Sequence, residues 1–404
     1  MLSEKRLKYR PSFVESEMKT FMISIVTPSL KQGKYIEETI KSVLHQEGNF
    51  YIDYIIMDGG SEDNTIEILQ KYDKLVKSQR WKPKCLGIEF RWTSEKDAGQ
   101  THAINKGFQI AKGDILSWIN SDDLYYDNAF SKVVEHFIKN PESDFVFGDG
   151  DVINESGDLQ WEWLSRPYNF KVLKSYHYLW NDFTNYIMQQ AAFWRKSVLE
   201  KIGLPDESLH YAMDIEYWLR IGKAGFKTAH VPTKLGKFRM IQGTKSLSSP
   251  TIFWREQLEI FRRYNGSKAM EPFLRYYFYN EGLHNGLDLD ILRGKRQQLF
   301  HQWRHLDAHE LSVLESESQK ALVKSSLMLA YKAVLNGENK KANSLYKKAI
   351  AQGPWHLFSY LSLWFLFSKL LDTSLSKHLG KFVQRVIHEY RMRKYLYRYL
   401  KREK

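Results

Sequence analysis

The chain has 404 residues and a mass of 47.9 kDa, which exceeds the usual size of one domain and predicts a large core domain with an appended module. Its only cysteine, Cys85, excludes an internal disulfide and a cysteine-rich metal site, so a reducing compartment fits the composition. Residues 1–21 form a charged N-terminal extension without an apolar stretch of signal-peptide length, and we therefore expect a cytoplasmic protein.

The net charge of +13 comes from the C-terminal part of the chain. Residues 251–404 contain 27 Lys and Arg against 14 Asp and Glu, whereas residues 1–250 contain 33 of each kind. A basic region indicates an anionic partner, either nucleic acid or an anionic membrane surface. Because no zinc-finger spacing or RNA-binding signature accompanies the charge, we expect no nucleic acid partner and favour the membrane surface.

Short apolar runs alternate with amphipathic stretches in the first part of the chain. The expected strands are residues 22–27, 51–57, 87–92, 114–119 and 144–149, and the expected helices between them are residues 35–44, 64–75, 100–111 and 129–137. This order predicts an α/β fold with a mostly parallel sheet flanked by helices on both faces. Ligands bind such sheets beyond the carboxyl ends of the strands.

The rest of the chain is organised differently. Residues 151–250 are richer in aromatic side chains and less regular, as expected for a substrate-facing half, with one amphipathic helix at 214–222. The chain then reads as almost entirely helical. We expect a core domain at 22–250, an all-helical appendage at 251–354, and an apolar helix with a basic tail at 355–404.

Two adjacent carboxylates follow the strand expected at 114–119, in the sequence AsnSerAspAsp at 120–123. Divalent cations such as Mg²⁺ or Mn²⁺ bind through one or two carboxylates together with substrate phosphates. A helix cap would explain an isolated acidic pair more simply. Here, however, Asp58 ends a neighbouring strand and Pro28–Ser29 end another, so three strand ends converge and favour a cation and diphosphate site.

Asp58 precedes two glycines, which let the backbone approach a flat ligand such as a base. The following Asp63 and Asn64 are explained as the start of a helix. Asp214 begins the amphipathic helix at 214–222, where it is either a charge favoured by the helix dipole or a general base.

Five segments together resemble glycosyltransferase family 2, which has a GT-A fold. The segments, which lie in the expected order within residues 22–246, are ISIVTPS (23–29), IIMDGGSEDNT (55–65), EKDAGQ with AINKG (95–107), GDILSWINSDDLY (113–125) and YAMDIEYWLR (211–220). The resemblance covers a little over half of the chain. It implies an inverting enzyme that uses a UDP-, GDP- or dTDP-activated sugar and a divalent metal, Mn²⁺ or Mg²⁺.

The resemblance also implies roles for individual residues. Asp58 would contact the nucleotide base, Asp122 would meet the ribose or metal region, and Asp123 would coordinate the cation that bridges the diphosphate. Asp214 occupies the position of the catalytic base, which implies a single displacement at the anomeric carbon. The other donor-site residues implied are Pro28 and Ser29 beside the base, Asp97, Gly99 and Gln100 in a donor-pocket loop, and Arg239 and Lys245 at the leaving diphosphate.

Four further residues, Gln189, Gln190, Trp194 and Trp218, fall in the acceptor-side half, where aromatic faces stack on sugar rings; burial in the core is the alternative for the tryptophans. Two positions depart from the family, because Met213 stands where many relatives are acidic and Ile241 where relatives often have histidine. The QxxRW signature of processive synthases is missing, which favours transfer of one sugar over polymerisation.

The expected function is assembly of a cell-surface glycan or a lipid-linked oligosaccharide, with a glycan or lipid-linked acceptor. One alternative is a sugar-phosphate nucleotidyltransferase, but that class usually shows a Gly-rich basic loop after the first strand, where this chain has TPSLKQG. The other alternative, a non-catalytic sugar-nucleotide-binding adaptor, would predict a damaged metal or base position, whereas Asp123 and Asp214 are both present.

The helical C-terminal part contains one stretch, residues 330–354, that resembles a single tetratricopeptide-like unit. About three such units are needed for a solenoid, so a helical appendage is the simpler account. Residues 355–371 are apolar, but at about 1.5 Å per residue they are shorter than the roughly 30 Å bilayer core. With the basic residues 377–404 they predict a peripheral anchor on the inner membrane face, with a solvated basic helix as the alternative.

Overall fold

The computed structural model describes residues 20–174, 187–241, 250–284, 289–302, 308–354 and 362. The described residues form two compact units. The first contains the segments up to Ser165, Ile187–Pro205 and Phe226–Met240, and the second contains the segments from Arg166, Asp206–Gly225 and the chain from Ile241 onward. The segment around Asp214 belongs to the same unit as the chain from Ile241 onward. The domain boundary expected at Pro250 stays a prediction.

The first half of the sheet contains the parallel strands and the intervening helices predicted from the sequence. Strands β1 (Phe21–Ser29), β2 (Glu47–Asp58), β3 (Lys84–Ser94) and β4 (Ile115–Trp118) are all parallel in the order β3-β2-β1-β4. The helices between them are α1 (Ile36–Leu44), α2 (Thr65–Lys77) and α3 (Gln100–Ile110), followed after β4 by α4 (Ala129–Lys139). Each predicted strand and helix in this region is confirmed.

The second half makes the sheet mixed. It contains β5 (Leu124–Tyr125), β6 (Phe145–Ile153), β7 (Leu159–Trp163), the 3-10 helix η1 (Gln189–Ala191), β8 (Ala192–Arg195), α7 (Lys196–Ile202) and β9 (Thr228–Arg239). The order continues as β4-β8-β6-β9-β5, with β7 beside β6. Strand β8 runs antiparallel to both its neighbours, whereas β6 and β9 are parallel.

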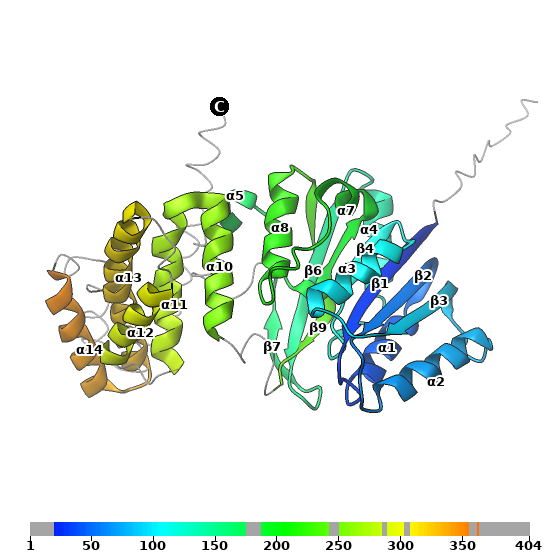
Figure 1. The fold of residues 1–404 in the computed structure, drawn as a ribbon, viewed down its shortest axis with the longest axis horizontal. Helices are drawn as coiled ribbons and strands as arrows, with labels where there is room; N and C mark the ends of the chain where they lie inside the picture. Colours follow the sequence, from blue (N-terminus) through cyan, green and yellow to red (C-terminus); the bar gives the residue numbers. More distant parts are fainter. Residues whose placement is uncertain are drawn as a thin grey trace, which may run out of the picture. The chain divides into compact units, whose positions relative to one another are not determined.

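Helices cover both faces of the sheet (Figure 1). On one face α1, α2 and α4 enclose the main apolar core with side chains such as Ile23, Ile52 and Phe130. On the other face α3 lies so close to β1 that a Cβ added at Gly107 would come within 2.4 Å of the Val26 side chain. Phe108 of α3 also makes an edge contact with Trp118. The core therefore fixes the strand ends from which the polar loops emerge.

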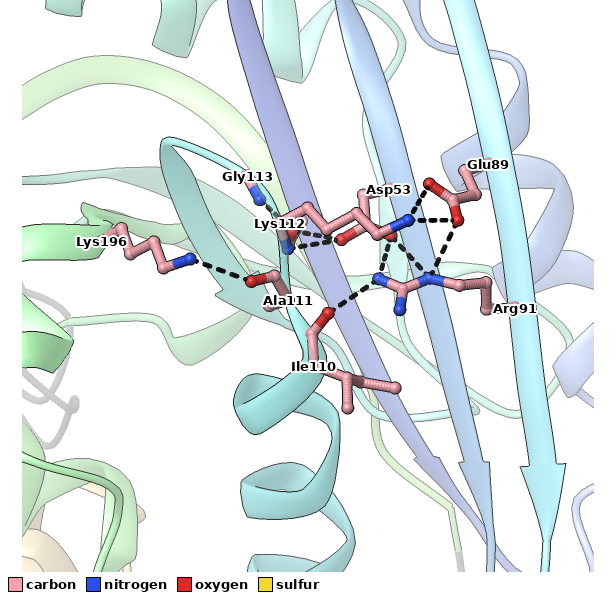
Figure 2. A network of polar contacts seen from close by, with 9 residues as sticks. Asp53, Glu89, Arg91, Ile110, Ala111, Lys112, Gly113 and Lys196 are labelled. Atoms are coloured by element: carbon pink, nitrogen blue, oxygen red, sulfur yellow. Dashed lines mark hydrogen bonds and ion pairs between the residues drawn. The ribbon is translucent and has the colours of Figure 1, made fainter.

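A buried carboxylate anchors the connection between α3 and β4 (Figure 2). Asp53 of β2 is fully buried and accepts hydrogen bonds from Ser24 Oγ at 2.6 Å, Arg91 Nε at 3.0 Å and the Lys112 backbone N–H at 3.0 Å. Arg91 also donates to the Ile110 carbonyl at 3.0 Å. Three strands and the end of α3 are thus joined through one side chain.

The second unit is helical in its described part, which confirms the helical prediction. It contains α5 (Phe170–Lys174), α8 (Met213–Lys223), α10 (Pro250–Asn265), the 3-10 helix η2 (Gly266–Ala269), α11 (Met270–His284), α12 (Leu289–Gln302), α13 (Ala308–Leu335) and α14 (Asn339–Gln352). Helix α13 packs between α11 and α14, and its contact with α14 includes Val323, Leu327 and Ala349.

Among the described residues, no helix is both long and apolar enough to cross a bilayer. The apolar helix and basic tail predicted at 355–404 lie outside the described residues, except for Ser362. The membrane anchor therefore stays a prediction.

Candidate active site

The carboxyl ends of the parallel strands β1, β2 and β3 meet at one edge of the sheet. The sequence predicted such a convergence for β1, β2 and β4, and β4 is also parallel to β1. Ser29, the last residue of β1, is in register with Asp58, the last residue of β2, and Asp58 is in register with Ser94 of β3. Backbone hydrogen bonds continue past the strands, because the Gly59 N–H donates to the Ser29 carbonyl at 2.8 Å and the Glu95 N–H donates to the Asp58 carbonyl at 2.9 Å. These hydrogen bonds therefore fix the strand ends relative to one another.

Asp58 organises the turn that follows its own strand. Its carboxylate is buried and accepts hydrogen bonds from the backbone N–H groups of Gly60 at 3.0 Å and Ser61 at 2.8 Å. The hydroxyls of Ser61 and Ser94 also donate to it, at 2.6 and 2.7 Å. Gly60 has a φ of 87°, which favours glycine. Asp58 thus shapes the loop directly, a role that sequence reasoning had not assigned to it.

Ser29 presents a buried polar atom beside this turn. Its side chain is 4% exposed, and its Oγ has no hydrogen-bond partner within the described part of the chain. Pro28, the residue before it, is also buried. Buried hydroxyls in proteins are usually hydrogen-bonded, so an unpartnered one at a strand end is suited to meet a polar ligand group.

A second polar chain starts at α3 and reaches the loop after β4. Asp97 accepts a hydrogen bond from the Gly99 backbone N–H at 2.8 Å, which shapes the turn before α3. Gln100, the first residue of α3, donates from Nε2 to Asn120 Oδ1 at 2.6 Å, and Asn120 donates from Nδ2 to Asp123 at 3.0 Å. The predicted donor-pocket residues Asp97, Gly99 and Gln100 therefore adjoin the acidic pair through Asn120.

Asp123 is fully buried and its two carboxylate oxygens are engaged by protein donors. Oδ1 accepts a hydrogen bond from the Arg239 backbone N–H at 2.8 Å. Oδ2 accepts from Gln190 Nε2 at 2.6 Å and from Asn120 Nδ2 at 3.0 Å. Burial and the charge of neighbouring Asp122 raise the pKa of Asp123, while these donors oppose that rise by stabilising the carboxylate. Asp123 thus joins β9 and η1 to the loop after β4.

Arg239 is the second buried charge of this loop, with 1% exposure. Its Nε donates to the Asp122 carbonyl at 2.9 Å, its Nη1 to the Glu155 carbonyl at 2.8 Å and its Nη2 to Glu38 Oε2 at 2.6 Å. All three guanidinium nitrogens therefore have protein acceptors. Arg239 thus holds the acidic loop against α1 and the turn after β6. Its contact with a leaving diphosphate stays a prediction.

Asp122 differs from Asp123 in exposure. It is half-buried, and its carboxylate accepts no hydrogen bond from another residue within the described part of the chain. Burial raises the pKa of Asp122, and the charge of Arg239 opposes this rise. A carboxylate oxygen with free lone pairs is a ligand that Mg²⁺ and Mn²⁺ accept. Asp122 therefore fits a cation better than Asp123.

No group of three or more His, Cys, Asp or Glu side chains among the described residues could hold a metal ion. Divalent cations in proteins also bind through one or two carboxylates together with substrate phosphates and water. Such sharing between a carboxylate and phosphates is the usual coordination of Mg²⁺ in nucleotide sites.

The four residues suggested for the acceptor are buried. Gln189 donates to the Trp118 carbonyl at 2.6 Å, and Gln190 is bonded to Asp123. Trp194 is fully buried and makes an edge contact with Trp118 at a centroid distance of 5.4 Å. Trp218 is 2% exposed. The two tryptophans are therefore core residues in this structure and offer no exposed stacking face, because their large apolar rings are enclosed.

Asp214 lies in the second unit, at the second residue of α8. Burial raises the pKa of Asp214 to about 6, although the Ile215 backbone N–H donates to its Oδ1 at 2.8 Å and opposes the shift. A carboxyl group with a pKa near neutrality can remove a proton at physiological pH.

Lys245 lies outside the described residues, so its predicted role stays a prediction.

Sequence reasoning missed Asn120, Glu38 and Glu155 as parts of this site. Asn120 adjoins the acidic pair in the sequence, so its position was a usable signal. No local pattern marked Glu38 or Glu155, because their partner Arg239 is far away along the chain.

The chain is similar to proteins of one enzyme family. Residues 24–203 match the model of the family described as glycosyl transferase family 2. The chain is similar to an uncharacterized glycosyltransferase of Methanocaldococcus jannaschii, with 24% identity over 55% of this chain and 72% of that protein. It is also similar to TuaG of Bacillus subtilis, named as a putative teichuronic acid biosynthesis glycosyltransferase, with 25% identity over 56% of this chain and 81% of that protein.

Among solved structures, TarS of S. aureus shares the fold. The TM-score is 0.50 and the sequences are 14% identical. The match covers 81% of this chain but only 54% of the TarS chain.

Proposed function

Because residues 24–203 form a glycosyltransferase family 2 domain with a GT-A-like fold, we propose that the protein transfers one sugar from a nucleotide-diphosphate sugar to an acceptor hydroxyl. The observation that carries this proposal is that the parallel strands β1, β2 and β4 end at one edge of the sheet, where an open α/β sheet binds its ligands. Ser29 and Asp58 end β1 and β2, and Asp122 lies in the loop after β4. The protein is a glycosyltransferase. The two alternative hypotheses, a sugar-phosphate nucleotidyltransferase and a non-catalytic sugar-nucleotide-binding adaptor, are therefore not favoured.

The nucleotide base lies against Ser29 and the turn shaped by Asp58. The unpartnered Ser29 hydroxyl and the glycine turn at Gly60, whose φ is 87°, support this placement. Asp97, Gly99 and Gln100 line the same side through the turn before α3. Arg239 contributes indirectly, by holding the loop that carries the acidic pair.

Asp122 would hold the divalent cation, Mn²⁺ or Mg²⁺, together with the donor diphosphate, and Asp123 orients the loop. This assignment departs from the expectation that Asp123 is the ligand, because both Asp123 oxygens accept protein hydrogen bonds. When bound, the cation neutralises negative charge that grows on the leaving nucleotide diphosphate.

Asp214 is the general base. It removes the proton of the acceptor hydroxyl while that oxygen forms a bond to the anomeric carbon and the bond from this carbon to the nucleotide diphosphate breaks. One displacement of this kind inverts the configuration at the anomeric carbon. The pKa of about 6 supports the role, since the carboxylate form predominates at neutral pH.

The acceptor is a cell-envelope glycan or a lipid-linked precursor of one. The support is the similarity to TuaG, whose name places it in teichuronic acid biosynthesis. The basic C-terminal part fits attachment to an anionic membrane surface, where lipid-linked acceptors are found. Removing residues 355–404 should then shift the protein from the membrane fraction to the supernatant, and unchanged fractionation would contradict the anchor.

The function is tested by a thermal-shift screen of UDP-, GDP- and dTDP-sugars in the presence of Mn²⁺. We expect at least one of these donors to raise the Tm of the wild-type protein. The same donor should stabilise Asp122→Asn much less. A screen in which no sugar nucleotide raises the wild-type Tm would contradict the donor site.

A further inference from the structure

The start of α8, the helix that carries Asp214, is held by a carboxylate from a different helix. Glu256 of α10 accepts a hydrogen bond at Oε1 from the His210 backbone N–H at 2.8 Å. Its Oε2 accepts from the backbone N–H groups of Tyr211 at 2.7 Å and Ala212 at 3.1 Å. Glu256 is 3% exposed, so these contacts are shielded from water. One side chain thus fixes three consecutive residues that lead into α8.

The local sequence offers no substitute for this contact. The N-cap residue of α8 is Ala212, which makes no side-chain capping hydrogen bond. The first N–H groups of a helix lack partners inside the helix and carry a partial positive charge, which a carboxylate stabilises. Glu256, 44 positions after Ala212, places its carboxylate at the N–H of this N-cap residue and of the two residues before it. Inside the first turn, the Ile215 N–H donates to Asp214 itself.

Helix α10 holds α8 at a second point, on the other side of Asp214. Glu216 is 2% exposed and accepts a hydrogen bond from the Tyr264 hydroxyl at 3.0 Å. Its other oxygen accepts from Arg220 Nε at 2.8 Å. Asp214 therefore lies between two contacts with α10, one through residues 210–212 and one through Glu216.

We propose that Glu256 is a positioning residue that sets the orientation of Asp214 for proton removal. This inference rests on the proposed function, in which Asp214 is the base. A base must lie within hydrogen-bond reach of the proton that it removes, and a displacement of about 1 Å can reduce the rate on the order of 10²-fold. Asp214 and Glu256 both lie beyond residues 24–203, so the proposed base and the helix that positions it lie outside the matched family region.

The test compares Glu256→Gln, Asp214→Asn and the double variant in the full-length protein. The probe is nucleotide release in Mn²⁺ from UDP-GlcNAc, UDP-glucose, GDP-mannose or dTDP-glucose, using the sugar nucleotide that raises the Tm most. Glutamine keeps the size of glutamate but replaces one accepting oxygen with an NH₂ group, which cannot accept from an N–H donor.

We expect Glu256→Gln to lower kcat between about tenfold and a hundredfold while the donor KM stays unchanged. Amide hydrogen exchange at residues 210–212 should become faster. The double variant should be no slower than Asp214→Asn, because both changes act through one base.

Glu281→Gln is the matched control. Glu281 is a buried glutamate of α11 in the same unit, paired with Lys295 at 3.3 Å, and its replacement should leave kcat at the wild-type value. If Glu256→Gln does not fold, Glu256→Asp replaces it, since it retains the carboxylate on a shorter side chain; we then expect a kcat below the wild-type value at an unchanged donor KM.

A wild-type kcat in the Glu256 variant beside an impaired Asp214→Asn would overturn this inference alone. So would a loss in the double variant that equals the product of the two single losses. A wild-type kcat in Asp214→Asn would contradict the proposed function as well, because Asp214 would then have no part in the reaction.

Discussion

The Nε atom of Arg239 donates a hydrogen bond to the backbone carbonyl of Asp122, 2.9 Å away. Arg239 ends β9, whereas Asp122 follows β4, and 117 positions separate them in the chain. The side chain of Arg239 is buried and satisfies acceptors on three segments. The orientation of the acidic loop therefore depends on the end of β9 as much as on its own strand.

Arg239→Lys should destabilise the protein even without a donor. A lysine ammonium is a compact charge and cannot reach the three acceptors that the planar guanidinium meets, so buried carbonyls lose their partners. We expect a loss of about 2 kcal/mol in the free energy of unfolding, measured by urea denaturation. Arg255→Lys, at a half-exposed position on α10, serves as the control and should change little. Equal free energies of unfolding for the two variants would contradict the conclusion that Arg239 holds these segments together.

Asp122→Asn and Asp123→Asn should separate cation binding from loop structure. Asp122→Asn should lower the apparent affinity for UDP in the presence of Mn²⁺, measured by thermal shift, at least tenfold. Without ligand, the Tm of this variant should stay near the wild-type value. Asp123→Asn places an NH₂ group against the donors from Gln190 or Arg239, and should lower the free energy of unfolding by about 2 kcal/mol. The reverse pattern would assign the cation to Asp123.

Ser29→Ala tests the orphaned hydroxyl at the sheet edge. Because Ser29 Oγ has no partner among the described residues, its removal should not lower the Tm, whereas the affinity for the donor should fall. Ser24→Ala on the same strand is the matched contrast, since Ser24 Oγ donates to Asp53 at 2.6 Å and accepts from the Gly113 N–H at 2.8 Å. That variant should lose stability and keep donor affinity, as measured by thermal shift and calorimetry.

The rate of transfer should fall in acid. Burial raises the pKa of Asp214 to about 6, and only the ionised form removes a proton. Below pH 6 we expect kcat/KM to drop about tenfold per pH unit. Because this pKa is raised in the folded state, Asp214 favours folding at low pH and this contribution is lost as the pH rises through 6. The stability of Asp214→Asn should therefore depend less on pH between 4 and 7 than that of the wild type.

Asp53→Ala should be the most damaging of these changes to the sheet. It removes the acceptor shared by Ser24, Arg91 and the Lys112 N–H, and breaking a buried ion pair costs about 3 kcal/mol. Glu89→Ala removes the neighbouring carboxylate, which is 42% exposed, and should cost at most about 1 kcal/mol (Figure 2). Similar unfolding midpoints for the two variants would contradict the buried anchor.

The first half of the sheet could be predicted because its signals are local. Residues such as Ile23, Ile52 and Ile115 belong to apolar runs with strand length, and the helices between them show a regular apolar face. Strands β5 and β8, in contrast, have only two and four residues, which are too few to show a periodic pattern of apolar side chains. Strand β9 contains Pro232 and many polar residues, and its pairing with β6 and β5 identifies it as a strand.

Some features of the candidate site could likewise be predicted from the sequence, and others could not. Asp58 and the acidic pair could be located because the ends of parallel strands meet at one edge. The different tasks of Asp122 and Asp123 could not, since they depend on donors such as Gln190, 67 positions away from Asp123. The burial of Trp194 likewise follows from its contact with Trp118, and the pattern of apolar residues in the sequence does not show this contact.

The grouping of residues 206–225 with the C-terminal helices bears on how the protein can be shortened. A fragment that ends at residue 250, where the sequence suggests a boundary, would retain α8 but lose Glu256 and Tyr264. The N–H groups before α8 would then face water, and Glu216 would lose a hydrogen-bond donor. Any minimal version that is to be crystallised or engineered should therefore extend at least through α10.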